Sequence, residues 1–112
     1  MIGQVKKTGR VTLLSLEGSF ELGKEAKLKE ALLQHMSMAE AEIVLNLKDV
    51  DFIDSACLGA LISVARRVRS SGGDIRLAQL NPEVASIFQI TRLDKVFQIF
   101  DQPEEAVSSY TS

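Results

Sequence analysis

The fold is decided by the stretch Asn46-Leu47-Lys48-Asp49-Val50-Asp51-Phe52-Ile53-Asp54-Ser55-Ala56-Cys57-Leu58-Gly59. The apolar run that leads into it, Ile43-Val44-Leu45, is typical of a parallel strand buried on both faces by helices. A helical pattern of apolar residues follows it: Leu58, Leu61, Ile62, Ala65 and Val68. In an open α/β sheet, partners and ligands bind beyond the carboxyl ends of the strands. The stretch therefore predicts a functional face at this strand-to-helix junction.

Three carboxylates and a serine stand in the junction, which we expect to be a loop: Asp49, Asp51, Asp54 and Ser55. A hydroxyl at the start of a helix is exposed, open to modification and close to the positive end of the helix dipole. Either Asp54 or Ser55 can also cap the helix, because both side chains accept hydrogen bonds from free backbone N–H groups. The residues alone leave two roles open for Ser55, a helix cap and a phosphate acceptor.

The rest of the chain continues the alternation of strands and helices. Thr8-Gly9 predicts a turn between two initial strands, and residues 24–38 have a helical pattern in which Met36 and Met38 fill the core. Gly72-Gly73 ends the central helix, and Asn81-Pro82 starts the next one. The remaining predicted elements are a strand at 42–47, a strand at 74–80, a strand at 96–100 and a final helix from about residue 102. We therefore predict one α/β domain over residues 1–112, with a central mixed sheet, mostly parallel after an initial hairpin, flanked by helices.

Composition excludes several classes of function. The 112 residues carry a formal net charge of −2, which argues against binding to nucleic acid. The clustered Arg66, Arg67 and Arg69 fall at a predicted helix C-terminus, where they complement the dipole. No apolar run reaches the roughly 20 residues of a membrane span. With one cysteine and no signal-peptide pattern, we expect a cytoplasmic protein that does not insert into membranes.

The residues give little support to catalysis. The clustered aspartates could bind magnesium, but solvated carboxylates are the simpler interpretation, and no phosphate-binding glycine-rich loop is present. Ser55 lacks the surroundings of a hydrolase nucleophile, and the only histidine, His35, belongs to another element. Cys57 lies in a first helical turn, where a dipole can lower a thiol pKa, but a small buried residue is the simpler interpretation. We expect a binding protein with no enzymatic activity, cofactor or metal.

At this point the residues resemble a known family, the sulfate transporter and anti-sigma factor antagonist (STAS) domain, and within it the bacterial anti-sigma factor antagonists. The resemblance runs from Leu16-Glu17-Gly18 to Leu93-Asp94-Lys95-Val96-Phe97. It is carried by Val44-Leu45-Asn46-Leu47, Val50-Asp51-Phe52-Ile53-Asp54-Ser55, Leu58-Gly59 and Gly72-Gly73. The chain departs from the family pattern at Ala56 and Cys57, where the family has Ser or Thr and then Gly. In the early loop, Glu21 is an acidic residue where the family has Asp, whereas Ser19 stands where the family has an acidic residue.

The resemblance implies a phosphorylation switch. Antagonists of this kind bind an anti-sigma factor, typically an ATP-binding serine kinase, and so free a sigma factor to regulate transcription. The kinase phosphorylates the serine after the motif aspartate, which breaks the complex, and a serine phosphatase reverses the modification. By position the phosphorylated residue is Ser55, presented by Asp54.

The predicted function is therefore an anti-sigma factor antagonist. The predicted partner-binding residues are Asp54, Ser55, Ala56, Cys57, Leu58 and Gly59, together with Glu21. Two other roles of STAS proteins stay open: a scaffold subunit of a stress-signalling assembly and an accessory subunit of a lipid-transport ATPase.

Overall fold

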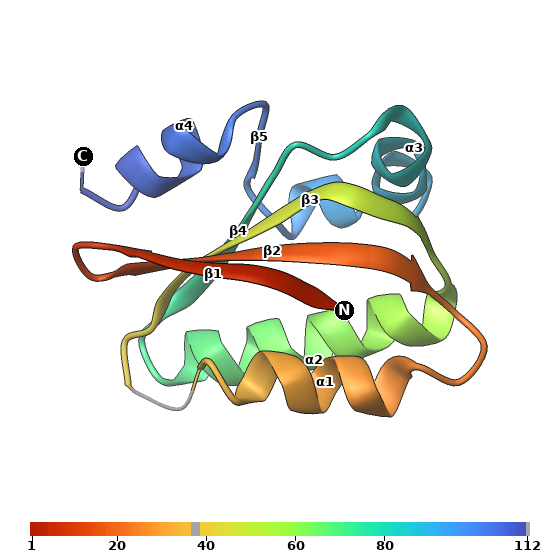
Figure 1. The fold of residues 1–112 in the computed structure, drawn as a ribbon, viewed down its shortest axis with the longest axis horizontal. Coiled ribbons are helices and arrows are strands. Elements are labelled where there is room, and N and C mark those ends of the chain that lie inside the picture. Colours follow the sequence, from red (N-terminus) through yellow and green to blue (C-terminus); the bar gives the residue numbers. More distant parts are fainter. Residues whose placement is uncertain (37–38, 112) are drawn as a thin grey trace.

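A central sheet of parallel strands, preceded by an antiparallel hairpin, organises the chain (Figure 1). The structure, a computed structural model, describes residues 1–36 and 39–111. Within these residues, five strands lie in the order β1-β2-β3-β4-β5, and every pair after β1 and β2 is parallel. The predicted fold class is confirmed. The elements are β1 Ile2–Thr8, β2 Val11–Phe20, α1 Glu25–Leu33, β3 Glu42–Ile53, α2 Ser55–Ser70, β4 Asp74–Ala78, α3 Pro82–Ile90, the 3-10 helix η1 Leu93–Lys95, β5 Ile99–Phe100 and α4 Pro103–Ser108.

The two faces of the sheet are covered unequally. Helices α1 and α2 lie along one face, and the short α4 lies over the other (Figure 1). The larger core joins Ile43 and Leu45 of β3 to the apolar sides of α1, α2 and α3, whereas Val44 joins a smaller cluster with Ala106 of α4. The middle strand is thus buried on both faces, as its unbroken apolar run predicted.

Strand β3 is longer than predicted. We expected it to end at Leu47, but it continues to Ile53 because β2 also continues, to Phe20, and pairs with it. Two register shifts in this pairing change the alternation of side chains. As a result Val50 and Ile53 are both buried in the larger core. The predicted loop of carboxylates is therefore wrong: Asp49 and Asp51 are exposed residues of a strand.

Further element boundaries differ from the prediction: the strand expected at 74–80 ends at Ala78, and α1 and the last strand are shorter than expected. Helix α1 ends at Leu33, and Met36 is buried beyond its end; the predicted core role of Met38 lies outside the described residues. The last strand is only Ile99–Phe100, because Phe97 turns into the core, where its ring lies 6.1 Å from that of Phe88. Propensity suits a strand here, but burial of an aromatic ring outweighs it.

Asp74 ties the carboxyl end of α2 to the start of β4. Its carboxylate accepts hydrogen bonds from Arg69 at 2.8 Å and Arg76 at 3.2 Å, so Arg69 is not the solvated helix end that we expected. Burial alone would raise the pKa of Asp74, but the two guanidinium groups outweigh burial and lower it. Beside it Gly73 has no room for a side chain, since a β-carbon would collide with the backbone of Ala41. The predicted end of the central helix at Gly72-Gly73 is confirmed, since α2 ends at Ser70 and Gly72 has a φ of +86°.

Candidate functional site

The junction between β3 and α2 is held by Asp54. Its backbone N–H donates to the carbonyl of Phe20 at the end of β2, 2.9 Å away. Its side chain caps α2, with Oδ1 accepting from the backbone N–H of Cys57 at 2.9 Å. Asp54 can make both hydrogen bonds because its backbone is extended, at φ −87° and ψ 175°, while its short carboxylate reaches back to the helix. Asp54 therefore fixes where the helix begins.

Ser55 is the first residue of α2 and is exposed to solvent. Its hydroxyl makes no hydrogen bond to any residue that the structure describes. Because Asp54 performs the capping, the interpretation of Ser55 as the helix cap is wrong. The serine is left with a free hydroxyl at the positive end of a helix.

The titratable groups around Ser55 have shifted pKa values in opposite directions. The backbone N–H of Cys57 lowers the pKa of Asp54; burial opposes this, and the N–H groups of Leu22 and Ala56 add to the lowering. A carboxylate that accepts several N–H bonds stays ionised at neutral pH. In contrast, burial raises the pKa of the Cys57 thiol to about 12. The helix dipole does not produce a reactive thiolate here.

The predicted partner-binding residues fall into two layers. Ser55, Ala56 and Gly59 are exposed, whereas Cys57 and Leu58 are 0% and 5% exposed and lie in the core. The departure from the family pattern at Cys57 therefore adds volume beneath the helix and leaves the outer surface unchanged. Of the two departures beside the serine, only Ala56 alters what a partner can touch.

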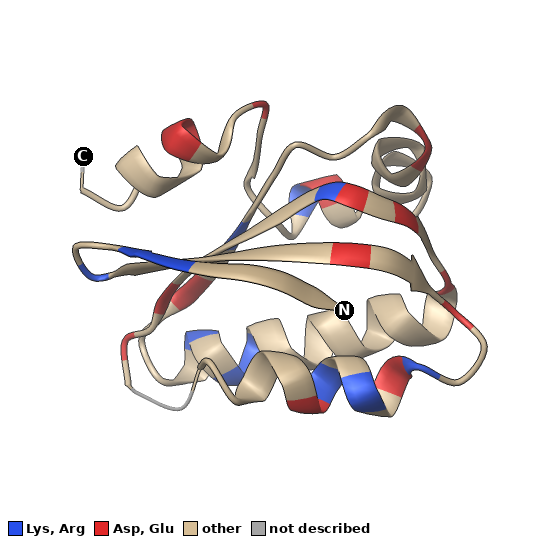
Figure 2. Cartoon of the chain, in the orientation of Figure 1, with Lys and Arg blue, Asp and Glu red and all other residues tan. Residues whose placement is uncertain are grey.

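The loop between β2 and α1 lies beside the start of α2. The backbone of Leu22 is close enough for its N–H to act on Asp54, while its side chain is 88% exposed, with a φ of +55°. Glu21 is half-buried, and Lys24 donates to the carbonyl of Ser19 at 3.0 Å. Figure 2 shows acidic residues along β3 and charges of both signs around the start of α1. Sequence reasoning singled out Glu21 in this loop but not Leu22, an apolar residue between an acid and a glycine that lies outside any periodic pattern.

Two further features of the described residues bear on function. They contain no group of three or more His, Cys, Asp or Glu placed to hold a metal ion. Nor does any helix in residues 1–36 and 39–111 combine the length and apolar character needed to cross a membrane.

The STAS domain family matches residues 4–106, so the chain belongs to this family. Among its relatives, the anti-sigma-B factor antagonist of Bacillus subtilis is 26% identical over 103 residues, which cover 92% of this chain and 94% of the relative. A Thermotoga maritima protein, provisionally named an anti-sigma factor antagonist, is 36% identical over 66 residues, which span 59% of this chain and 58% of that relative.

The crystal structure of a Thermotoga maritima protein with the same provisional name superposes with a TM-score of 0.89 at 25% identity. This match covers 97% of this chain and 94% of that one. The chain is thus a distant homologue of anti-sigma factor antagonists, with the same fold along nearly its whole length.

Proposed function

We propose that the chain is an anti-sigma factor antagonist whose binding is controlled by phosphorylation of Ser55. The observation that carries this proposal is the free, exposed hydroxyl of Ser55, which the cap formed by Asp54 leaves available. A kinase needs a hydroxyl that it can reach from solvent and whose modification does not disturb the core. The partner is an anti-sigma factor with serine kinase activity, and a serine phosphatase restores the binding form. Such partners work in the cytoplasm.

The docking surface consists of Glu21, Leu22, Ser55, Ala56 and Gly59, which we call the Ser55 surface. Leu22 provides its apolar contact, since a side chain that is 88% exposed gains most from burial against a partner. Ala56 and Gly59 are small, so a partner can approach the first turns of α2 closely. Asp54, Cys57 and Leu58 support this surface from below.

Phosphorylation would change the charge of this surface without unfolding it. A phosphate adds about −1.5 to −2 charge at neutral pH. The start of a helix tolerates that charge, because its free N–H groups and dipole favour anions. A partner that docks against Ser55 would instead meet a bulky dianion beside the ionised Asp54. The modification therefore weakens docking while the fold persists.

The direct test is to incubate the chain with its cognate anti-sigma kinase and ATP and to map the phosphate by mass spectrometry. We expect one phosphate on Ser55 and none on the Ser55→Ala variant. For binding, Ser55→Asp should weaken the complex strongly with little change in melting temperature, whereas Ser55→Ala should still bind. Ser86→Asp on α3 is the matched control, an exposed helical serine outside the Ser55 surface. Phosphate on another residue, or equal binding by Ser55→Asp and Ser55→Ala, would refute the switch.

The two other STAS roles predict a different behaviour in solution. A scaffold subunit would assemble into large particles with its partners, and a transporter accessory subunit would co-purify with a membrane ATPase. An antagonist forms a small complex with its kinase. Light scattering of the chain mixed with the kinase separates an antagonist from a scaffold subunit, and co-purification with a membrane ATPase would identify the accessory subunit.

A further inference from the structure

The later part of β3 carries an exposed aromatic side chain, Phe52, three residues before Ser55. Phe52 is 41% exposed. Side chains alternate between the two sides of a strand, and the neighbouring Ile53 points into the larger core, so Phe52 points away from that core. Helix α4 leaves Phe52 uncovered, because the cluster beneath α4 takes Val11 and Val44 from the first parts of β2 and β3.

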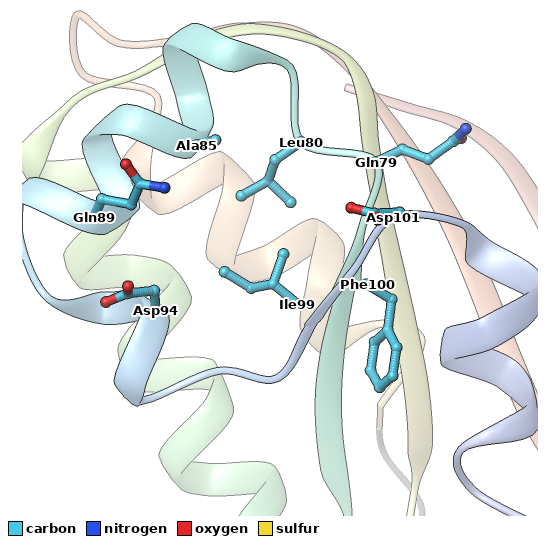
Figure 3. Close-up of a pocket in the computed structure, with 8 residues that line it drawn as sticks. All are labelled: Gln79, Leu80, Ala85, Gln89, Asp94, Ile99, Phe100 and Asp101. Carbon is cyan, nitrogen blue, oxygen red and sulfur yellow. The ribbon is translucent and has the colours of Figure 1, made fainter.

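The other four phenylalanines are packed within the domain. The buried ones are Phe20, Phe88 and Phe97. Phe100 packs against the cluster beneath α4. Its ring points away from Leu80 and from the cavity of about 310 Å³ that lies between α3, η1 and β5 (Figure 3). Phe52 is thus the one exposed phenylalanine of the chain.

Phe52 and Leu22 flank the same junction. Asp54 follows Phe52 by two residues, and its N–H donates at 2.9 Å to the carbonyl of Phe20, which precedes Leu22 by two residues. A single exposed apolar side chain is ordinary on a protein surface. Two large ones at one junction, one of them aromatic, have the composition of the centre of a protein–protein interface.

The Ser55 surface is too small to hold a protein partner by itself. A stable interface buries about 800 Å² on each partner and uses roughly 20–30 residues a side, which corresponds to a patch with a radius of about 16 Å. An extended chain advances at most about 3.6 Å per residue, so the Cα atom of Phe52 lies within about 11 Å of that of Ser55. An interface of ordinary size centred on Ser55 therefore extends as far as Phe52.

The charges beside Phe52 define the partner's chemistry. Asp49 and Asp51 are exposed residues of β3, and Asp49 stands opposite the exposed Glu17 of β2 (Figure 2). Like charges that face each other across two strands repel. None of the three carboxylates makes an ion pair with a described residue, Lys48 included. A basic partner surface would relieve this repulsion, whereas an acidic one would add to it.

We infer that the partner at the Ser55 surface also contacts the end of β3, and that it receives the ring of Phe52 in an apolar pocket bordered by basic side chains. We call Glu17, Asp49, Asp51 and Phe52 the Phe52 surface. The inference rests on the proposed function for the partner, the anti-sigma kinase, but not on phosphorylation of Ser55. The ring supplies affinity, and the carboxylates speed association and disfavour acidic partners.

The first test is calorimetric titration of the full chain with the cognate anti-sigma kinase. Phe52→Ala should weaken binding at least about tenfold, as truncation of a central aromatic contact does. Phe52→Thr keeps a residue that favours strands and should weaken binding as much, with both melting temperatures checked by circular dichroism. Val5→Ala is the matched control, because Val5 is 43% exposed on β1, and it should bind like the unsubstituted chain.

The second test concerns the charge of the partner. Asp51→Asn should weaken binding by about two- to fivefold at low ionic strength, the range of an exposed ion pair. The difference should shrink at about 1 M salt, which screens charges within about 3 Å. Glu104→Gln removes an exposed carboxylate from α4 and should change nothing. Tighter binding by Asp51→Asn, or an equal loss with Glu104→Gln, would overturn the basic border of the pocket.

The outcomes separate this inference from the proposed function. Unchanged binding by both Phe52 variants, with binding still weakened by Ser55→Asp, would overturn the inference alone. No binding of the kinase by the unsubstituted chain would refute the proposed function and this inference with it. A loss with Val5→Ala as large as that with Phe52→Ala would show that the effect is not local to β3. A dimer of the chain that Phe52→Ala dissolves would also overturn the inference, since a second copy would then be the occupant.

Discussion

Substituting Gly59 by alanine should make the protein more stable and its binding weaker. Gly59 is an exposed interior residue of α2, and a β-carbon there would meet no heavy atom within 4 Å outside the local helix backbone. Alanine is favoured over glycine in a helix interior by about 0.8–1 kcal/mol. With an unfolding entropy of about 2.1 cal/mol/K per residue, the melting temperature of a domain of this size should rise by about 4 °C.

The same methyl group would stand on the Ser55 surface. A methyl forced into a close-packed contact costs about 1–3 kcal/mol, which corresponds to binding weakened by about 5-fold to 150-fold. Gly59→Ala therefore separates two quantities that most substitutions change in the same direction. A destabilised variant can lose binding because it unfolds, but a stabilised variant cannot.

The assay pairs thermal unfolding by circular dichroism with calorimetric titration against the cognate anti-sigma kinase. Ser86→Ala is the matched control, because it adds helix propensity at an exposed site of α3 and should leave binding unchanged. Unchanged binding by a stabilised Gly59→Ala would exclude this part of α2 from the docking surface. A lower melting temperature would show that the surroundings of Gly59 do not accept a methyl group.

Three further predictions concern the core and the charges. Gly73→Ala should destabilise the protein by at least about 2 kcal/mol in urea unfolding, because the new β-carbon would collide with the carbonyl of Ala41 and lie 2.7 Å from its nitrogen; a loss below about 0.5 kcal/mol would contradict this. Cys57, with a pKa raised to about 12, should react with iodoacetamide at pH 8 roughly a thousandfold more slowly in the folded than in the urea-unfolded chain, and equal rates would refute its burial. Because folding lowers the pKa of Asp74, its ionised form stabilises the protein above about pH 4 and this contribution is lost as pH falls further. Asp74→Asn should therefore lower the melting temperature at pH 7, and the difference from the unsubstituted protein should narrow as pH falls below about 4. A difference that widened in acid would contradict this prediction.

Local patterns were sufficient to predict the order of strands and helices. The apolar run Ile43-Val44-Leu45 required helices on both sides, and the spacing after Leu58 required a helix. Glycine and proline fixed the ends, as at Gly72 and Pro82. These signals act between residues close in sequence, so they can be read without the fold.

The lengths of β3 and β5 could not be predicted in this way. Strand β3 extends to Ile53 only because β2 runs beside it, and two register shifts bring Val50 and Ile53 to the core. Strand β5 is short because Phe97 packs against Phe88 of α3. Both outcomes depend on partners that are distant in the sequence, which local propensity does not contain.

By itself, the sequence determined that an aspartate and a serine stand where a buried strand gives way to a helix. Only the tertiary structure decided that Asp54 caps the helix and leaves the hydroxyl of Ser55 free, that Cys57 points into the core, and that Leu22 lies beside them. The reason is geometric. Sequence spacing determines the order of side chains along α2, but their exposure depends on how the helix packs against the sheet and on which loop the end of β2 brings to its first turn.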